Sequence, residues 1–334
     1  MKNKISLKDI AEKVGVSVTL VSYVLNNKME GRINKEVAQK IRDTAKKLNY
    51  RTNQIAKSLK TNKTNTIGLI VADISNPFYS ALARIIEDEA EKFNYTVIFG
   101  SSDENLKKSE KLIDIFINRQ VDGLIYAASE NSESQLEDLI GQKIPFVLVD
   151  RYFPTVNCSY VALDNYSASY KAVEYIIQKG RRRIAMIGYK SALHHLRDRK
   201  RGYISALKKH KLETKSAWLK EVRREDEIQQ VEKAMMELMA EKQPIDAILF
   251  GANRIATAGL KYISSLPVKV PDDLLIVSFD ESESLDLFRS PIDYIKQPLR
   301  ELGEESVRLL LQSIDKKTVI TQVNLQAELV IKNK

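Results

Sequence analysis

The sequence predicts an α/β protein in which an all-α helix-turn-helix headpiece precedes a two-lobed body of doubly wound parallel sheets. Two observations carry this prediction. From Thr66 onward, apolar runs typical of buried strands alternate with helical segments, as in parallel sheets covered by helices. Before Thr66, short helical patterns follow one another without a strand pattern. The body, roughly 270 residues, exceeds one ordinary domain, so it should divide into two lobes.

Charge is divided unevenly along the chain. The 334 residues carry a net charge of +9, but residues 1–65 hold 15 lysines and arginines against 5 acidic residues. The remainder holds 38 against 39 and is almost neutral. A basic segment attached to a neutral body indicates a polyanion-binding module. The alternative is a solvated basic tail, which would lack the periodic apolar residues of this segment.

Composition favours a cytoplasmic protein. Hydrophobic residues make up 43% of the chain, and no run approaches the roughly 20 apolar residues of a membrane span. The stretch MKNKISLKDIAEK lacks the apolar segment of a secretory signal. Cys158 is the only cysteine, which excludes an internal disulfide and fits a reducing compartment.

The first expected helix begins after Ser6, which forms a capping-box pattern with Asp9. Gly15 suits the end of this helix because glycine tolerates a positive φ, and Ser17 is a natural N-cap for the next helix. A third helix should follow Asn34. Apolar residues recur at helical spacing in all three: Leu7, Ile10, Ala11 and Val14, then Leu20, Val21, Val24 and Leu25, then Val37, Ile41, Ala45 and Leu48. This is the helix-turn-helix pattern.

The second of these helices, SVTLVSYVLNN, has an outer face without any charge. The face consists of Val18, Thr19, Ser22, Tyr23 and Asn26. In a helix-turn-helix, the second helix lies in the major groove and reads base edges with hydroxyl and methyl groups. The surrounding lysines and arginines can bind phosphates. We therefore expect sequence-specific binding to double-stranded operator DNA; an ordinary three-helix bundle is the alternative.

Longer motifs give a resemblance to a known family. The segments SLKDIAEKVGVSVTLVSYVLNN and INKEVAQKIRDTAKKLNYRTNQIAKSLKTNKTNTIGLIVADISNPFY are followed by VDGLI, VDR, LDN, IVSFDE and QPLRELG. In this order they resemble the lac-repressor (LacI/GalR) family of bacterial transcription regulators. The resemblance runs from Ser6 through the whole chain, and it implies a body like that of periplasmic sugar-binding proteins.

The resemblance also implies roles for headpiece residues. Base-reading positions are occupied by Val18, Thr19 and Tyr23, and phosphate-holding positions by Ser17, Ser22 and Asn26. Tyr23 replaces a commoner arginine, so the outer operator bases cannot be transferred from other members of the family.

Residues 53–60, NQIAKSLK, resemble the family's hinge helix, which enters the minor groove. The resemblance implies DNA contacts from Asn53, Leu59 and Lys60, with Leu59 wedged into the central base step. About eight residues are too few for a stable isolated helix, so the hinge should become ordered only on DNA. A plain linker is the alternative.

These patterns set the expected domain boundaries. The headpiece should span residues 1–52, the hinge residues 53–62 and the body residues 63–334. Within the body, the first lobe should comprise about residues 66–162 and 292–322, and the second about residues 163–291 and 323–334.

The sequence contains no recognisable catalytic or metal-binding constellation. It has no GxGxxG, P-loop, HExxH or GxSxG motif. His194 and His195 are adjacent rather than spaced for a metal site on a helix. We expect no enzymatic activity, no cofactor and no metal.

Polar and aromatic residues follow several expected strands, where parallel sheets gather ligand-binding groups. Carboxylates and amides can bind hydroxyl pairs, and an aromatic ring can stack on a sugar. Each residue alone could merely cap a helix, but together they match the family's effector cleft: Asn76, Phe78, Tyr79, Asp150, Arg199, Asn253 and Asp280. Arg254 replaces the family's usual aspartate and would make this region more positive if it faced the cleft.

The sequence therefore predicts a homodimeric transcription regulator, with repressor as the first expectation, controlled by a sugar-like effector bound between the lobes. A neutral sugar suits the carboxylates, whereas an acidic or phosphorylated sugar would suit the arginines. The alternatives are a periplasmic-type sugar-binding protein without gene regulation and a sugar-processing enzyme. The basic headpiece argues against the first and the lack of catalytic motifs against the second.

Overall fold

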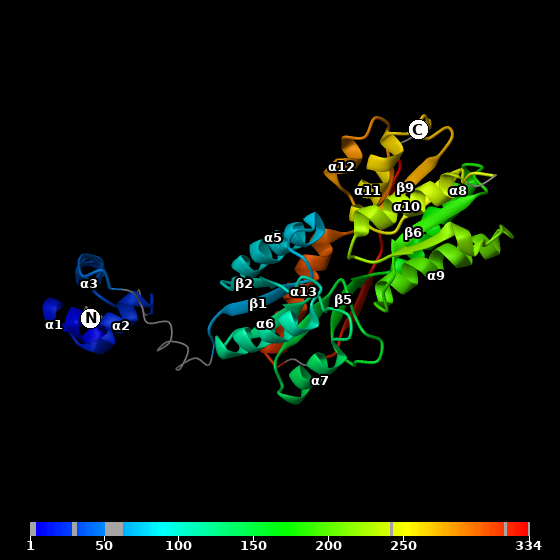
Figure 1. Cartoon of the computed structure of the whole chain (residues 1–334). Helices are drawn as coiled ribbons and strands as arrows, with labels where there is room; N and C mark the ends of the chain where they lie inside the picture. Colours follow the sequence, from blue (N-terminus) through cyan, green and yellow to red (C-terminus); the bar gives the residue numbers. More distant parts are fainter. Residues whose placement is uncertain (1–4, 29–31, 51–62, 241–242, 317–318, 333–334) are drawn as a thin grey trace. The chain divides into compact units, whose positions relative to one another are not determined.

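A computed structural model describes the chain except for residues 1–4, 29–31, 51–62, 241–242, 317–318 and 333–334 (Figure 1). The chain divides into two compact units, Met1–Thr64 and Asn65–Lys334. The first contains the expected headpiece and the second the expected body. The whole expected hinge, residues 53–62, lies outside the described residues, and with it Asn53, Leu59 and Lys60, whose roles stay predictions. Within the described part, no helix is long and apolar enough to cross a membrane.

The headpiece packs α1 (Leu7–Val14), α2 (Val18–Leu25) and α3 (Lys35–Lys47) around a small apolar core. The capping box forms as predicted, because the Ser6 amide donates to Asp9 Oδ2 at 2.8 Å and the Asp9 amide donates to Ser6 Oγ at 3.4 Å. Gly15 ends α1 with a φ of 80°. Ser17 Oγ accepts from the Leu20 amide at 3.2 Å. The buried core residues are Ile10, Ala11, Val21, Val24, Ile41 and Ala45.

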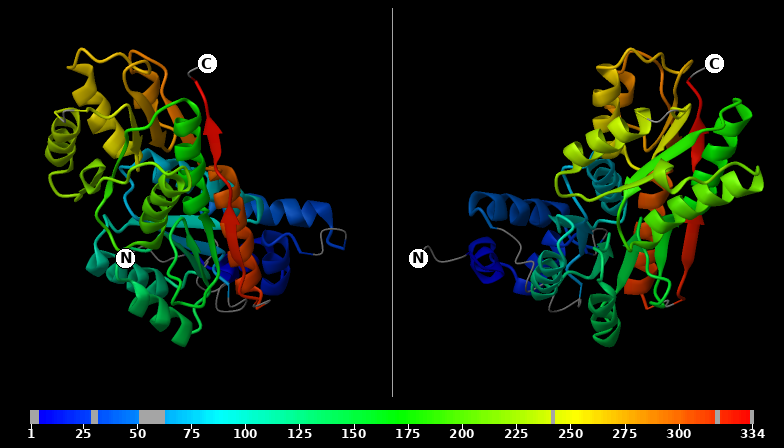
Figure 2. Two further views of the ribbon diagram at one scale, coloured as in Figure 1. Left: turned by 90° about the vertical axis from the view of Figure 1, so that its right-hand side faces the viewer. Right: turned by 45° about the vertical axis from the view of Figure 1, so that its right-hand side comes forward.

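The first lobe of the body is a parallel sheet with helices on both faces (Figures 1 and 2). Its strands run in the order β11-β5-β4-β3-β1-β2. Alternate residues of β1 face opposite layers: Ile67 and Leu69 pack with α5 and α13, and Ile70 packs with α6. The strands are β1 (Thr66–Val71), β2 (Thr96–Ser101), β3 (Gly123–Tyr126), β4 (Phe146–Val149), β5 (Tyr160–Leu163) and β11 (Gln322–Leu325). The helices are α5 (Pro77–Lys92), α6 (Leu106–Asn118), α7 (Glu133–Gly141) and α13 (Leu299–Ile314).

The second lobe repeats this arrangement in the order β12-β10-β9-β8-β6-β7. Helices α8 and α9 pack on one face of its sheet, and α10 and α11 pack on the other. The strands are β6 (Ile184–Tyr189), β7 (Leu219–Val222), β8 (Ala247–Phe250), β9 (Leu275–Phe279), β10 (Asp293–Lys296) and β12 (Glu328–Val330). The helices are α8 (Asn165–Gln178), α9 (His194–Lys209), α10 (Glu227–Met239), α11 (Asn253–Ser264), the short α12 (Glu283–Asp286) and a 3₁₀ turn at Ser216–Trp218.

The chain passes between the lobes after β5, after β10 and between β11 and β12, and Figure 2 shows β11 and β12, in red, running from one lobe into the other. The expected boundary before residue 292 is therefore wrong, because β10 pairs with β9 of the second sheet. The boundary after residue 322 would cut β11, which pairs with β5 along its length. The sheets are parallel as predicted, apart from the edge strand β12, which pairs antiparallel with β10.

Candidate functional site

In the headpiece, α2 carries the predicted DNA-contacting residues on one side. Ser17, Val18 and Thr19 are exposed, whereas Ser22, Tyr23 and Asn26 are half-buried. The opposite side of the helix, with Val21 and Val24, is buried against the core. The Asn26 side chain donates to the carbonyl of Ser22 at 2.8 Å. A phosphate contact from Asn26 would therefore use its second amide hydrogen.

In the body, all seven predicted effector residues line one cavity between the lobes. The first lobe contributes Asn76, Phe78, Tyr79 and Asp150, and the second contributes Arg199, Asn253 and Asp280. Parallel strands explain this convergence, because their carboxyl ends lie at one edge of each sheet and the two edges face each other. The fold thus brings together residues far apart in the sequence: Asn76 and Asp280 are separated by 204 positions.

Local backbone geometry places these side chains directly at the strand ends. Asp150 follows β4 and Asp280 follows β9, with φ values of 68° and 71°. Positive φ values are uncommon outside glycine but are tolerated by aspartate and asparagine. Asn76 is the N-cap of α5 and accepts from the Phe78 amide at 3.1 Å. Asn253 begins α11 and is separated from the end of β8 by two residues.

The first lobe contributes a buried tyrosine–carboxylate pair to the wall of the cavity. The Tyr79 hydroxyl donates to Asp150 Oδ2 at 2.6 Å. Burial raises the pKa of the Asp150 carboxyl, and the nearby Arg151 guanidinium and the Tyr79 hydrogen bond oppose this effect. The Phe78 ring stands edge-on to Tyr79, with 5.0 Å between the ring centroids. The pair therefore offers acceptor oxygens beside a flat apolar surface.

Arg199 is fixed from three sides in the second lobe. Its Nε donates to Asn165 Oδ1 and its Nη1 donates to the carbonyl of Gly251, both at 2.7 Å. The guanidinium carbon lies 4.0 Å from the centroid of the Phe279 ring. Burial lowers the pKa of Arg199, while Asp280 and Asp150 act in the opposite direction. A guanidinium held in this way is preorganised for a bidentate contact with a ligand.

The cavity includes a charged group that the sequence analysis did not identify. Arg151 binds Glu104 through two hydrogen bonds of 2.7 and 2.6 Å, and Arg224 of the second lobe approaches Glu104 at 2.9 Å. Arg151 directly follows Asp150 in the VDR motif, so the sequence could have indicated that it lies near the cavity. Glu104 and Arg224 lie outside helices and strands, without any periodic pattern, and the fold alone brings them together.

Polar contacts join the two lobes across the cleft. Arg254 Nη1 lies 3.1 Å from Asp73 Oδ2, and the side-chain amide Nδ2 of Asn253 donates to Asn76 Oδ1 at 2.9 Å. With the lobes in these positions, the cavity has a volume of about 40 Å³. Pockets for drug-sized ligands measure roughly 300–1,000 Å³, so a sugar would require the lobes to separate.

Arg254 does not add free positive charge to the cavity. Besides Asp73, it approaches Glu227 Oε1 at 3.4 Å. Its side chain is 46% exposed. The sequence analysis expected Arg254 to make the cleft more positive if it faced the cleft. Arg254 does not do so, because the carboxylates of Asp73 and Glu227 compensate its charge.

The adjacent histidines have separate environments. His195 is buried in the cavity wall, and burial lowers its pKa well below the ordinary value, with Arg151, Arg199 and Arg224 acting in the same direction. The Nε2 atom of His194 lies 3.1 Å from Oδ2 of Asp198, which is one helical turn further along α9. Among the described residues, no group of histidine, cysteine, aspartate or glutamate side chains could hold a metal ion.

Comparisons with known proteins agree with this architecture. Residues 6–53 match the family model described as bacterial regulatory proteins, lacI family, and residues 64–333 match that of periplasmic binding proteins and the sugar binding domain of the LacI family. The chain is 30% identical to catabolite control protein A of Priestia megaterium, covering 96% of this chain and 95% of that protein. It is 32% identical to a ribose operon repressor of Halalkalibacterium halodurans, covering 95% and 92%.

The fold is also that of a solved repressor. The structure of the lac repressor dimer bound to operator and an anti-inducer superposes with a TM-score of 0.85 over 98% of each chain, at 20% identity. The relatives are transcription regulators rather than enzymes, as the sequence analysis predicted for this chain. With a matching headpiece and a matching body on one polypeptide, the chain belongs to the lacI family of bacterial regulatory proteins.

Proposed function

We propose that this regulator is a cytoplasmic, homodimeric repressor that binds operator DNA through α2 and is controlled by a sugar or sugar derivative bound between the lobes. The observation that carries the proposal is the convergence of the seven predicted effector residues on one cavity. The relatives include a ribose operon repressor, and the operator-bound lac repressor is a dimer. These names support the proposed class of effector and the proposed assembly.

In this proposal, the effector takes over polar contacts that now join the lobes. Asp150, Asn253 and Asp280 present oxygen and amide groups suited to hydroxyl pairs, and the Phe78 ring suits the apolar face of a sugar. Two buried carboxylates disfavour an anion, and the charge of Arg254 is already compensated. A neutral sugar therefore fits the cleft better than an acidic one.

The physical link to DNA is conformational. An effector that binds one arrangement of the lobes more tightly shifts the population toward that arrangement. If the same arrangement sets the spacing of two headpieces in a dimer, effector and operator affinities are coupled reciprocally.

Arg199→Ala tests the cleft. We expect loss of effector binding by about 10- to 100-fold or more, because a buried charged hydrogen-bond donor contributes roughly 1.5–3 kcal/mol. The measurement is calorimetry with neutral sugars that stabilise the wild type in a thermal-shift screen, where a ligand at about 100 times its Kd adds roughly 2.7 kcal/mol.

Arg300→Ala on α13 is the matched control, since its side chain is 78% exposed and pairs only with Glu304 among the described residues. It should leave sugar affinity unchanged. Wild-type affinity in a folded Arg199→Ala variant would show that the effector binds elsewhere.

A further inference from the structure

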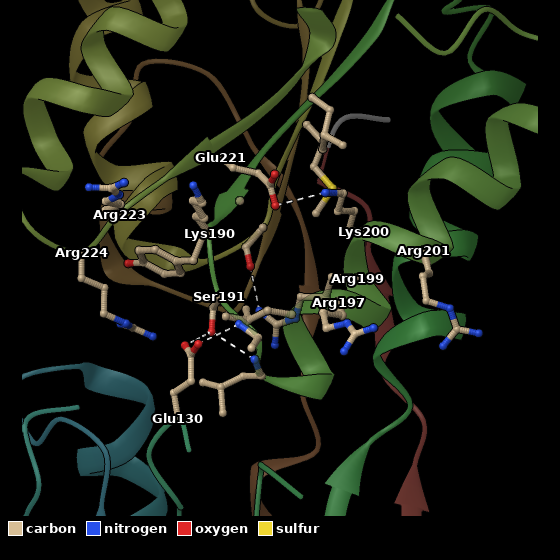
Figure 3. A pocket seen from close by; sticks show the side chains of 18 of the residues that line it. Glu130, Lys190, Ser191, Arg197, Arg199, Lys200, Arg201, Glu221, Arg223 and Arg224 are labelled. Atoms are coloured by element: carbon tan, nitrogen blue, oxygen red, sulfur yellow. Dashed lines mark hydrogen bonds and ion pairs between the residues drawn. The ribbon is translucent and has the colours of Figure 1, made fainter. Parts of the chain in front are cut away.

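A second, larger cavity lies beside the cleft on the second lobe, between α9 and the strands β6 and β7 (Figure 3). Its volume is about 870 Å³, which is within the range of small-molecule sites. It shares a wall with the cleft cavity through Glu104, Tyr189, Leu196, Arg199 and Arg224. The proposed sugar contacts Asn76, Asp150, Asn253 and Asp280 do not line it.

The floor of this side pocket is apolar and is left open by a glycine. Met186 and Gly188 of β6 stand beside Leu219 and Glu221 of β7 in register, and Leu193 and Leu196 of α9 add further apolar surface. A Cβ placed on Gly188 would meet only the Met186 methyl, at 3.6 Å, which is ordinary contact. The pocket therefore exists partly because residue 188 has no side chain.

The rim of the side pocket is cationic. Seven lysines and arginines line it, against the four acidic residues Glu104, Glu130, Glu221 and Glu225. Three of these acids have partners: Glu221 pairs with Lys200 at 3.1 Å, Glu104 pairs with Arg224, and Glu130 accepts from Ser191 and from the Ala192 amide.

Three cations of the rim are uncompensated. The side chains of Lys190, Arg197 and Arg223 are exposed and have no ion pair or hydrogen bond among the described residues. In Figure 3, Arg223 lies to one side of Lys190 and Arg197 to the other. Only Glu225 opposes them without a partner of its own among the described residues.

We propose that the side pocket binds a small organic anion, a carboxylate or phosphate ester with an apolar or ring-shaped body. The open floor accepts the body, and the unpaired arginines at the rim bind the anionic group through charge-assisted hydrogen bonds. The site is additional to the proposed sugar cleft. Glu104 and Glu130 of the first lobe form part of its wall, so occupancy of the pocket bears on the contacts that join the lobes.

Two kinds of ligand could supply this anionic group. It can belong to a separate small molecule, or it can be a substituent on the ligand that fills the cleft. Phenyl phosphate and benzoate represent the first source, with benzyl alcohol as their uncharged match. Glucose 6-phosphate represents the second, with glucose as its uncharged match.

The test is calorimetry on the full chain with three variants. Arg197→Gln combined with Arg223→Gln removes two of the three unpaired rim charges and leaves Lys190, and Gly188→Leu fills the floor. The control combines Arg300→Gln with Arg308→Gln, which removes the same charge from exposed positions on α13. We expect at least one anionic probe to bind wild type, with a loss of about tenfold or more in the rim variant and in Gly188→Leu, and no loss in the control.

Asn253→Ala then assigns the source, because Asn253 lines only the cleft. A separate anion keeps its affinity in this variant, whereas a cleft ligand with an anionic substituent loses it. If Asn253→Ala loses neutral-sugar binding but keeps anion binding, the side pocket and the proposed sugar cleft are two separate sites. The proposal is overturned if no anionic probe binds wild type with a Kd below about 1 mM, or if the rim variant and the control lose affinity equally.

Discussion

At the scale of single residues, three buried polar atoms in the cleft have no hydrogen-bond partner among the described residues. They are Arg151 Nε, His195 Nδ1 and Gln297 Oε1. Buried polar groups are nearly always paired, by protein, water or ligand. All three residues line the cleft cavity. A bound ligand with hydroxyl groups would satisfy them, and a water molecule would fit the present volume.

His195 should make the stability of the body depend on pH. Its pKa in the folded state lies well below 6.5, whereas the unfolded chain takes up a proton as the pH falls through about 6.5. The unfolded state then binds more protons, so the free energy of unfolding falls by up to about 1.4 kcal/mol per pH unit below that point. Denaturant unfolding of wild type and His195→Gln at several pH values measures the difference.

The His195→Gln variant should show a shallower loss of stability between about pH 6.5 and 5.5, because it lacks the titrating group. Identical slopes in the two proteins would mean that the pKa of His195 is the same in the folded and the unfolded chain.

At the scale of elements, we propose that neighbouring residues of α2 make two different kinds of DNA contact. Tyr23 stands at a proposed base-reading position and Ser22 at a proposed phosphate-holding one, and both are half-buried at the same level of the helix. Base contacts set sequence preference, whereas phosphate contacts set affinity for all sequences. The two roles therefore predict different results from two single substitutions.

Tyr23→Ala should cost roughly 1–3 kcal/mol on the operator and relax the preference at one base pair of each half-site. Ser22→Ala should weaken operator and random DNA by a similar factor, because it removes only a phosphate contact. Competition binding with operators substituted one base pair at a time gives both quantities. A uniform loss in Tyr23→Ala would show that this residue does not read a base.

The elements also show what the sequence could and could not predict. Central strands such as β3, β4 and β8 are buried along their whole length, and their continuous apolar runs were visible in the sequence. Edge strands β7, β11 and β12 are short and half-exposed, so they lack such runs and were not predicted. Edge strands are defined by their neighbours in the sheet, which local sequence does not encode.

The same distinction holds for the cleft. Its strand-end residues could be predicted because strand ends are visible as pattern changes and because motifs resembled a family. Glu104 and Arg224 could not, since both lie in loops without a periodic pattern or a quoted motif, and they meet only when the lobes fold. The side pocket was missed for a related reason: its cations are scattered along α9 and the loops, where charged residues usually face solvent.

At the scale of the whole molecule, the chain is built from two units with separate tasks. The headpiece has its own core, and residues 65–334 form a second compact unit. Removing residues 1–64 should therefore leave a folded body that binds its effector with unchanged affinity but does not shift operator DNA. Calorimetry and gel-shift assays test the two halves of this expectation. Operator binding by the truncated chain would refute the assignment of DNA recognition to the headpiece.

The closed arrangement of the lobes gives the last prediction. Two ion pairs cross the cleft, Glu104–Arg224 at 2.9 Å and Asp73–Arg254 at 3.1 Å. Both arginines are partly exposed, so solvent screens each pair and each contributes little alone. After both are replaced with glutamine, Glu104 stays paired with Arg151 and Glu227 still accepts from the Tyr189 hydroxyl, so neither carboxylate loses all of its partners. The double variant should therefore fold but favour separated lobes.

Small-angle scattering of residues 65–334 should show a larger radius of gyration for Arg224→Gln with Arg254→Gln than for wild type. The paired substitution Arg300→Gln with Arg308→Gln serves as the charge-matched control and should scatter like wild type. A sugar needs a larger cleft than the closed lobes leave, so in the full chain it should bind the double variant more tightly, because less closure energy opposes its binding. By linkage, the operator affinity of the ligand-free double variant should move toward that of the sugar-bound wild type. Unchanged scattering together with unchanged effector affinity would show that packing, rather than these ion pairs, holds the lobes closed.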